Sequence, residues 1–376
     1  MSLRASLVLT TIREPTVLDS YLENLRHHGH LDDVEAYVIP DRKTPQRAYE
    51  RCAELVRSGF AAKCPTLNEQ EAFLQRVGFP SDLIPWDSDN RRNVGFLMAL
   101  ESGSDFMISI DDDNYCRNDV DLFAAHAVVC QPAGPAQVAD CDDGWFNVCT
   151  LLELDRPDTT YPRGFPYYAR HRPTVAKMST ASMEVHINAG LWLLAPDVDA
   201  INWLVAPSQA VAFKGPSLVL GHDTWSPINT QNTALRREAL GAYYYVKAGW
   251  ALDGLRLERY SDIFSGYLVQ ACAKHLGAAI RFGTPVADHR RNAHNYMKDA
   301  SDEWGFILLF EDVLPWLHDA RLSGSTYLET YTALSHCLEE AIEKQRGTIW
   351  TNAARGYFHQ TADLMRSWVR TVDKFA

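Results

Sequence analysis

The stretch Phe106-Met107-Ile108-Ser109-Ile110-Asp111-Asp112-Asp113 decides how this chain is expected to fold. Its first five residues are mostly apolar, rich in isoleucine and without helical periodicity, which predicts a short buried strand. Three carboxylates follow directly, at the position where an α/β sheet usually holds its ligand. The stretch therefore predicts an acidic ligand site at the carboxyl end of a strand.

The three carboxylates repel one another. Two carboxylates about 5 Å apart cost about 3 kcal/mol at an effective dielectric constant near 20. A divalent cation is the simplest way to offset that cost, and Mg²⁺ and Mn²⁺ often take phosphate oxygens as their remaining ligands. The alternatives are a solvated acidic turn or a calcium loop, but Tyr115 stands where such a loop has an oxygen ligand and no turn glycine follows. The pattern favours a metal-dependent enzyme that acts on a phosphorylated substrate.

Composition excludes several other classes of protein. The net charge of −12 argues against nucleic-acid binding, which needs a basic surface. The eight cysteines are scattered without CxxC pairs, so a zinc ribbon or a disulfide scaffold is not expected. The apolar stretch near the N-terminus is too short for a signal peptide, and no stretch reaches the length of a membrane span. A soluble, cytoplasmic protein is expected.

Strands and helices alternate on the N-terminal side of the aspartates, which predicts a mostly parallel, doubly wound sheet. The expected strands are 5–11, 34–39, 106–110, 146–152, 190–194 and 278–282, and the expected helices are 16–26, 46–58, 68–77, 91–100, 263–276, 327–344 and 352–372. Residues 131–143 and 155–173 are expected to form loops. These elements predict an α/β catalytic domain over residues 1–310 and a helical C-terminal extension over residues 311–376.

Four side chains outside the aspartate triplet are candidates, each with an ordinary alternative. Arg163 lies in a loop stiffened by two prolines and a glycine, where it could bind a diphosphate or simply face solvent. Asp262 begins an apolar helix and is either a helix cap or a general base. His289 follows a strand and a Pro285 turn, as a surface residue or a metal ligand. Trp192 is either core or a surface on which a sugar or base stacks.

Several short motifs together resemble a known family. They are Thr11-Ile12-Arg13, Ile110-Asp111-Asp112-Asp113, Arg163-Gly164-Phe165-Pro166, Gly190-Leu191-Trp192, Pro227 with Asn232-Thr233-Ala234, Arg259-Tyr260-Ser261-Asp262, and His289. In this order they resemble the reversibly glycosylated polypeptides of glycosyltransferase family 75, which include the UDP-arabinopyranose mutases of plants. The resemblance implies a GT-A fold, a Rossmann-like mixed sheet flanked by helices. It also implies a nucleotide diphosphate sugar, most often UDP-linked, held through Mn²⁺ or Mg²⁺.

The resemblance also implies roles for individual residues. Asp113 and His289 would be metal ligands, Asp111 would lie beside the ribose, and Asp112 would support one or both of these aspartates. Arg163 matches the arginine that becomes glycosylated in the family, and Asp262 matches a catalytic base. The remaining expected nucleotide-sugar contacts are Thr11, Arg13, Asp41, Arg92, Trp192 and Asn232.

The chain departs from the family pattern around the sugar and acceptor region. Ser261 replaces an acidic residue, Arg290 to His294 differs from a stretch with lysine and asparagine, and Asn114 follows Asp113 where the family has cysteine. The function predicted is a metal-dependent glycosyltransferase that uses a nucleotide diphosphate sugar, with a small-molecule acceptor. The alternatives are a pyranose/furanose mutase with reversible self-glycosylation and a non-catalytic partner subunit. The C-terminal helices, with Tyr327, Leu328, Tyr331 and Leu334 on one face, are either core or a contact in a homo-oligomer.

Overall fold

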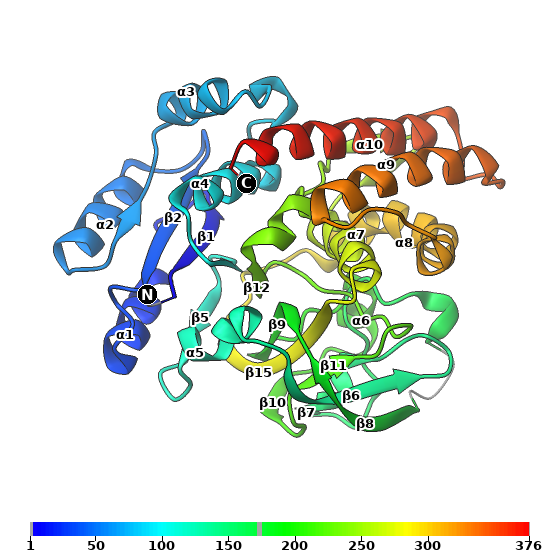
Figure 1. The fold of residues 1–376 in the computed structure, drawn as a ribbon, viewed down its shortest axis with the longest axis horizontal. Coiled ribbons are helices and arrows are strands. Elements are labelled where there is room, and N and C mark those ends of the chain that lie inside the picture. Colours follow the sequence, from blue (N-terminus) through cyan, green and yellow to red (C-terminus); the bar gives the residue numbers. More distant parts are fainter. Residues whose placement is uncertain (1–2, 171–174, 376) are drawn as a thin grey trace.

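A computed structural model describes residues 3–170 and 175–375 and shows a large mixed sheet with helices packed around it (Figure 1). The strands are β1 Ala5–Thr11, β2 Val34–Pro40, β3 Ala62–Lys63, β4 Phe106–Ile110, β5 Asn114–Cys116, β6 Gly134–Cys141, β7 Leu152–Leu154, β8 Ala176–Met183, β9 Val185–Leu194, β10 Ala210–Phe213, β11 Leu218–Leu220, β12 Asn232–Arg236, β13 Trp250–Leu252, β14 Leu255–Leu257 and β15 Ala279–His289. The helices are α1 Leu18–His28, α2 Gln46–Arg57, α3 Leu67–Val77, α4 Arg92–Ser102, α5 Leu122–His126, α6 Ala200–Val205, α7 Ser261–His275, α8 Tyr296–Asp319, α9 Tyr327–Lys344 and α10 Asn352–Val372. These elements confirm the predicted α/β class with a helical C-terminal part.

The N-terminal strands form the parallel part of the sheet, in the order β3-β2-β1-β4. Strand β4 is buried along its whole length, because the sheet is covered on both faces: Met107 belongs to one apolar cluster, and Phe106, Ile108 and Ile110 belong to another. Parallel pairing places the carboxyl ends of β1, β2 and β4 at one edge. Thr11, Asp41 and Asp111 therefore leave the sheet close together, as expected for a ligand site.

The other half of the sheet is mixed, and its register completes that edge. Strand β12 runs antiparallel to β4 with Asn232 opposite Ile110, so Gln231 lies next to Asp111. Strand β15 runs antiparallel to β5 with His289 opposite Asn114, which places His289 beside Asp113. Strand β9 is parallel to β15 and ends at Leu194, opposite His289. Chain segments far apart in sequence thus meet at one edge.

Some predicted elements differ from those in the structure. Residues 131–143 were expected to be a loop but contain β6, whose partly exposed residues pair with β8 and carry no apolar run. Residues 146–152 were expected to be a strand, but Val148–Leu151 forms a 3₁₀ helix and β7 begins only at Leu152. His289 was expected in a loop and is instead the last residue of β15, which continues through Pro285 with an irregularity in its pairing.

The apolar core is continuous from the N-terminal strands to the C-terminal helices. Val8, Met107, Leu334 and Trp368 belong to the same buried cluster. The boundary expected between residues 310 and 311 lies inside α8, and the division into two parts stays a prediction. On α9, Tyr327, Tyr331 and Leu334 are buried within this chain, which makes that face core.

The C-terminal end of the chain is also tied to the N-terminal half. Lys374 donates a hydrogen bond of 2.8 Å to the carbonyl of Val77 at the end of α3, and the C-terminus lies close to α4 in Figure 1. In the described part of the chain, the helices all fall short of the length and apolarity needed to span a bilayer.

Replacing Trp368 should test whether the C-terminal helices are part of the core. Its side chain is fully buried, and its indole N–H donates to the carbonyl of Leu240 over 2.9 Å. We expect Trp368→Ala to lower the free energy of unfolding by about 3–5 kcal/mol. Trp304→Ala, at a position 41% exposed on α8, is the control and should change it by less than about 0.5 kcal/mol. Urea unfolding measures both, and equal effects would mean that α10 is not part of a common core.

Candidate active site

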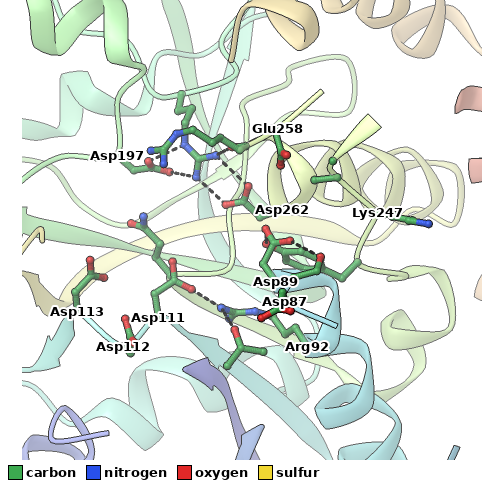
Figure 2. A pocket seen from close by; sticks show the side chains of 18 of the residues that line it. Asp87, Asp89, Arg92, Asp111, Asp112, Asp113, Asp197, Lys247, Glu258 and Asp262 are labelled. Carbon is green, nitrogen blue, oxygen red and sulfur yellow. Dashed lines mark hydrogen bonds and ion pairs between the residues drawn. The ribbon is translucent and has the colours of Figure 1, made fainter. Parts of the chain in front are cut away.

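A cavity of about 700 Å³ opens at the edge where the carboxyl ends of the strands meet. Its charged lining consists of eight carboxylates (Asp87, Asp89, Asp111, Asp112, Asp113, Asp197, Glu258, Asp262) and six cationic side chains (Arg92, Arg163, Lys247, Arg256, Arg259, Arg291), together with His289 and His294. Asp113 and Lys247 lie on opposite sides of the view in Figure 2. The carboxylates outnumber the cationic side chains. The lining therefore has carboxylates left over that could bind a positively charged ligand.

Asp111 is held in place by one arginine. Arg92, at the start of α4, donates to its Oδ1 over 2.6 Å and also to the hydroxyl of Ser109 and the carbonyl of Ile110. Burial raises the pKa of Asp111 to about 6, with Arg92 opposing the shift and Asp113 and Asp262 adding to it. Arg92 thus holds Asp111 in place and opposes its protonation.

Asp112 faces the end of β1. The hydroxyl of Thr11 donates to its Oδ2 over 2.6 Å, and the backbone N–H of Arg13 donates to the Thr11 oxygen over 3.0 Å. Burial raises the pKa of Asp112, and Asp113 adds to the shift against the hydrogen bond from Thr11. Thr11 and Arg13 were expected to touch a nucleotide; in the structure they support Asp112 from outside the cavity lining.

Asp113 and His289 form the pair best suited to hold a cation. Nε2 of His289 lies 3.5 Å from Oδ2 of Asp113, a separation that two ligands of one ion would have. Nδ1 of His289 lies 2.7 Å from the carbonyl of Ala195, the arrangement that orients a metal-binding imidazole. Burial raises the pKa of Asp113, but His289 outweighs burial and the net shift is downward, so the carboxylate stays ionised. These residues fit a divalent cation.

The pair does not make a complete metal site by itself. Among residues 3–170 and 175–375, no group of three or more His, Cys, Asp or Glu side chains is arranged to hold an ion. Asn292 donates to Oδ2 of Asp113 over 3.2 Å and also accepts from Arg13, which links the loop after β1 to the segment after β15. Two protein ligands suit an ion whose other ligands are phosphate oxygens and water.

Arg163 is buried and lines the same cavity. Its guanidinium donates to both oxygens of Asp197, at 2.9 and 3.1 Å, and to both oxygens of Asp262, at 3.0 and 2.8 Å. Burial lowers the pKa of Arg163, but the two carboxylates outweigh it and raise the pKa well above its ordinary value. Figure 2 shows Asp197 and Asp262 near each other, with dashed lines running to a guanidinium between them, and the hydrogen bonds identify it as that of Arg163. The loop position of Arg163 was therefore no sign of exposure.

The local backbone conformation explains how Arg163 and Asp262 come together. Gly164 has φ +87°, and a Cβ there would lie 2.3 Å from the side chain of Ile263, so the glycine lets the Arg163 loop pack on α7. Asp262 lies in the first turn of α7, whose N-cap is Tyr260, so the expected capping role does not apply to Asp262. Just before the helix, Arg259 has φ +62°, which is uncommon for a residue with a side chain.

Three other expected contacts lie outside the cavity lining. Asp41 accepts from the backbone N–H groups of Arg42 and Ser88, and so fixes the loop that carries Asp87 and Asp89. Asn232 is buried, donates to the carbonyl of Leu191 and lies 2.8 Å from His126. Trp192 is buried in the core. Their roles as nucleotide-sugar contacts stay predictions.

The sequence reasoning missed several residues that line the cavity. Asp197 is the most important, because it pairs with Arg163 from the loop after β9. The only signal was its place in the loop shortly after an apolar strand, and Asp199 lies in the same loop. Asp89, which accepts from the hydroxyl of Tyr245, lies in a loop whose sequence gives no indication of a site.

The fold and cavity together define an α/β protein of the ligand-binding type, with an acidic strand edge suited to a cation and a buried arginine in the same cavity. Comparison with known proteins identifies the family. Residues 6–376 match the family described as "Reversibly glycosylated polypeptide", and the chain belongs to that family. The resemblance expected from the sequence is thereby confirmed, and with it an enzyme of the glycosyltransferase or related mutase type.

The individual relatives share low sequence identity with this chain. The chain is 26% identical over 301 residues to UDP-arabinopyranose mutase 1 of Arabidopsis thaliana, covering 79% of this chain and 76% of the relative. It is 24% identical over 372 residues to probable UDP-arabinopyranose mutase 4 of the same plant, covering 96% and 88%. Among solved structures, it is similar to glucosyl-3-phosphoglycerate synthase from Mycobacterium tuberculosis in complex with Mn²⁺, UDP and phosphoglyceric acid. That similarity has a TM-score of 0.41 and 13% identity, and covers 86% of this chain and 81% of the other.

The Asp113–His289 pair predicts that cation binding depends on pH. Burial lowers the pKa of His289, but Asp113 and Asp197 outweigh it and raise the pKa above its ordinary value near 6.5. The ring therefore keeps its proton to a higher pH than usual, and a proton and a cation compete for Nε2. We expect Mn²⁺ to raise the melting temperature more at pH 8.5 than at pH 6, by about 2 °C or more. Thermal unfolding at the two pH values measures this difference.

Without a cation, the effect of His289 on stability runs in the opposite direction. The stabilisation from protonated His289 is fully present below the unfolded pKa and is lost as pH rises through the higher folded pKa. His289→Gln removes the titrating ring and should make the Mn²⁺ shift small and equal at both pH values. A wild-type shift that is equal at both values would contradict the assignment of His289.

Proposed function

We propose that this protein is a metal-dependent enzyme that acts on a nucleotide diphosphate sugar, most simply a UDP-sugar, and that it changes the ring form of the sugar through transfer to Arg163. The observation that carries the proposal is the buried ion pair between Arg163 and Asp262. Family membership and relatives named as UDP-arabinopyranose mutases support it. The proposal favours the mutase over the transferase that the sequence alone suggested first.

The ion pair helps to choose between the mutase and the transferase, because it engages Asp262, the expected catalytic base. An external acceptor needs a carboxylate free to take its proton, within hydrogen-bond reach. Both oxygens of Asp262 already accept from the guanidinium of Arg163, at 3.0 and 2.8 Å. The proton that Asp262 is placed to receive is therefore one from Arg163, which makes Arg163 the acceptor.

The chemistry of this transfer balances without a further reactant. An Nη atom of Arg163 forms a bond to the anomeric carbon while the bond from that carbon to the diphosphate oxygen breaks, and its electrons leave with the diphosphate. The displaced N–H proton goes to Asp262. On the arginine, the ring oxygen leaves the anomeric carbon and takes a proton, a C=N bond forms, and a different hydroxyl adds to that carbon and releases a proton. Return of the sugar to the diphosphate reverses the first step.

The acidic edge contributes at the other end of the donor. Asp113 and His289 would hold a divalent cation, which when bound supplies positive charge to the departing diphosphate. Asp111, fixed by Arg92, and Asp112, fixed by Thr11, are placed to accept hydrogen bonds from hydroxyl groups of the nucleotide sugar. Such an arrangement corresponds to the GT-A type of site, in which carboxylates at the strand ends bind the nucleotide and the ion.

The proposal is tested by incubating the protein with Mn²⁺ and UDP-arabinopyranose, without an acceptor, and following the ring form of the sugar by NMR. We expect conversion to a furanose and, by peptide mass spectrometry, a pentose on Arg163. Arg163→Lys should lose both signals, because the primary ammonium cannot form the paired contacts of a guanidinium. Arg170→Lys is the matched control, since Arg170 is also ion-paired to an aspartate but lies outside the cavity lining.

Other outcomes would decide against the mutase. Transfer of the sugar to an added small molecule, without ring change or sugar on Arg163, would establish the transferase instead. Absence of both reactions with a panel of UDP-sugars, together with loss of Mn²⁺ and UDP binding in calorimetry, would point to a non-catalytic partner subunit.

A further inference from the structure

Every N–H group of the Arg163 side chain has an acceptor. Nε and Nη2 donate to Asp197, Nη1 and Nη2 donate to Asp262, and Nη1 also donates to the backbone carbonyl of Arg259. A guanidinium has five N–H donors in one plane, so this set is saturated. We call Asp197, Asp262 and the Arg259 carbonyl the arginine cradle. A guanidinium held this way cannot turn about its own axis without breaking charged hydrogen bonds.

Asp197 is the most rigid member of the cradle. Its backbone carbonyl accepts from the backbone N–H of Arg163 over 2.8 Å, so the two residues are joined through both main chain and side chain. Its Oδ2 also accepts from the side chain of Asn229 over 2.6 Å. Asp197 is 4% exposed, so these contacts are shielded from water. Each carboxylate oxygen is held on at least one side by the protein.

The Arg259 carbonyl shows that the backbone is adapted to the cradle. Arg259 adopts φ +62°, and such a conformation persists only where surrounding contacts hold it. Its side chain is bound to Glu303 at 3.1 Å and lies 3.5 Å from Asp299, both buried on α8. Strained backbone and buried carboxylates thus combine to aim one carbonyl at Arg163.

Saturation in the plane restricts how Arg163 can react. Hydrogen-bond acceptors occupy the directions of all the N–H bonds, so a carbon electrophile reaches an Nη atom only across the face of the guanidinium. The orientation of that face then decides whether the anomeric carbon can approach, because reacting atoms must meet within about 3–3.5 Å in line with the attacking orbital. Asp197, which binds the guanidinium side-on at Nε and Nη2, fixes that orientation.

Asp197 also balances the positive charge of Arg163 during the proposed transfer. A guanidinium that gains a sugar and loses one proton is still a cation. If Asp262 takes the proton, it becomes neutral and no longer balances that cation. Asp197 remains ionised and keeps a buried positive charge paired, which a single carboxylate could not do. Two carboxylates around one arginine are therefore what the transfer step requires, one to receive the proton and one to hold the charge.

We propose that Asp197 is a positioning residue, which sets the plane of the Arg163 guanidinium and carries its counter-charge while Asp262 takes the proton. The proposal rests on the proposed transfer to Arg163 and assigns the two carboxylates different tasks within it. It places an essential residue in the loop after β9, outside the acidic strand edge and outside the first turn of α7.

The experiment compares Asp197→Asn with Asp199→Asn. Asp199 lies two residues further, is buried and pairs with Arg170 at 2.6 Å, but does not line the cavity. Both changes remove one carboxylate from a buried arginine pair, so loss of stability alone affects both. We expect Asp197→Asn to lower kcat about 100-fold while KM for the UDP-sugar changes less than about threefold, and to slow sugar loading on Arg163 by the same factor as kcat. Asp199→Asn should keep kcat within about twofold of wild type.

A second variant covers the case in which Asp197→Asn does not fold. Asp197→Glu restores the negative charge with one extra methylene, and it should load sugar on Arg163 at least about tenfold faster than Asp197→Asn, or measurably where the Asn variant is unfolded. Binding of Mn²⁺ and UDP, measured by thermal shift, reports folding of each variant independently of catalysis.

The outcomes separate this inference from the proposed function. Wild-type loading of sugar on Arg163 together with equal loading by Asp197→Asn would overturn the role of Asp197 and leave the proposed function intact. Equal losses of kcat in the Asp197 and Asp199 variants would also overturn it, because both would then act through stability. Absence of sugar on Arg163 in the wild-type protein would overturn the proposed function and this inference with it.

Discussion

Mutual repulsion among carboxylates at one sheet edge is the constraint on which the rest of the structure depends. Parallel pairing of β1, β2 and β4 brings their carboxyl ends together, and three of the residues that follow β4 are aspartates. The protein offsets the repulsion residue by residue: Arg92 pairs with Asp111, Thr11 donates to Asp112, and His289 approaches Asp113. Of these partners only Arg92 carries a permanent charge, so the edge keeps an excess of negative charge that a cation can balance.

Around Arg163 the requirement is the reverse, because a buried positive charge has to be balanced. A buried guanidinium needs counter-charge, and Arg163 has two carboxylates rather than one. The resulting cradle includes a backbone carbonyl in a strained conformation and is braced by buried acidic residues of α8. The cavity thus contains both a pair of residues suited to a cation and a fixed arginine, which together suit the proposed transfer of a sugar away from a diphosphate.

Prediction from sequence succeeded where local pattern decides structure. Strand β4, strand β1 and helices α9 and α10 have the predicted bounds, because apolar runs and amphipathic periods are read from neighbouring residues. It failed at β6, which is a partly exposed strand stabilised by pairing with β8, and at His289, whose place in β15 depends on pairing with β5. The short sequence motifs predicted most of the candidate residues. They did not predict Asp197 or the pairing of Asp262 with Arg163, because both depend on contacts between segments far apart in sequence.

The sequence by itself determined the α/β class, the acidic strand end and the family to which the chain belongs, because each is carried by short contiguous motifs. Only the tertiary structure decided which side chains those motifs meet. It placed Thr11, Arg13 and Asp41 behind the cavity wall as supports, set His289 beside Asp113, and enclosed Arg163 between Asp197 and Asp262. The physical reason is that strand register and helix packing fix the distances between charges, and those distances decide which carboxylate is paired and which is free.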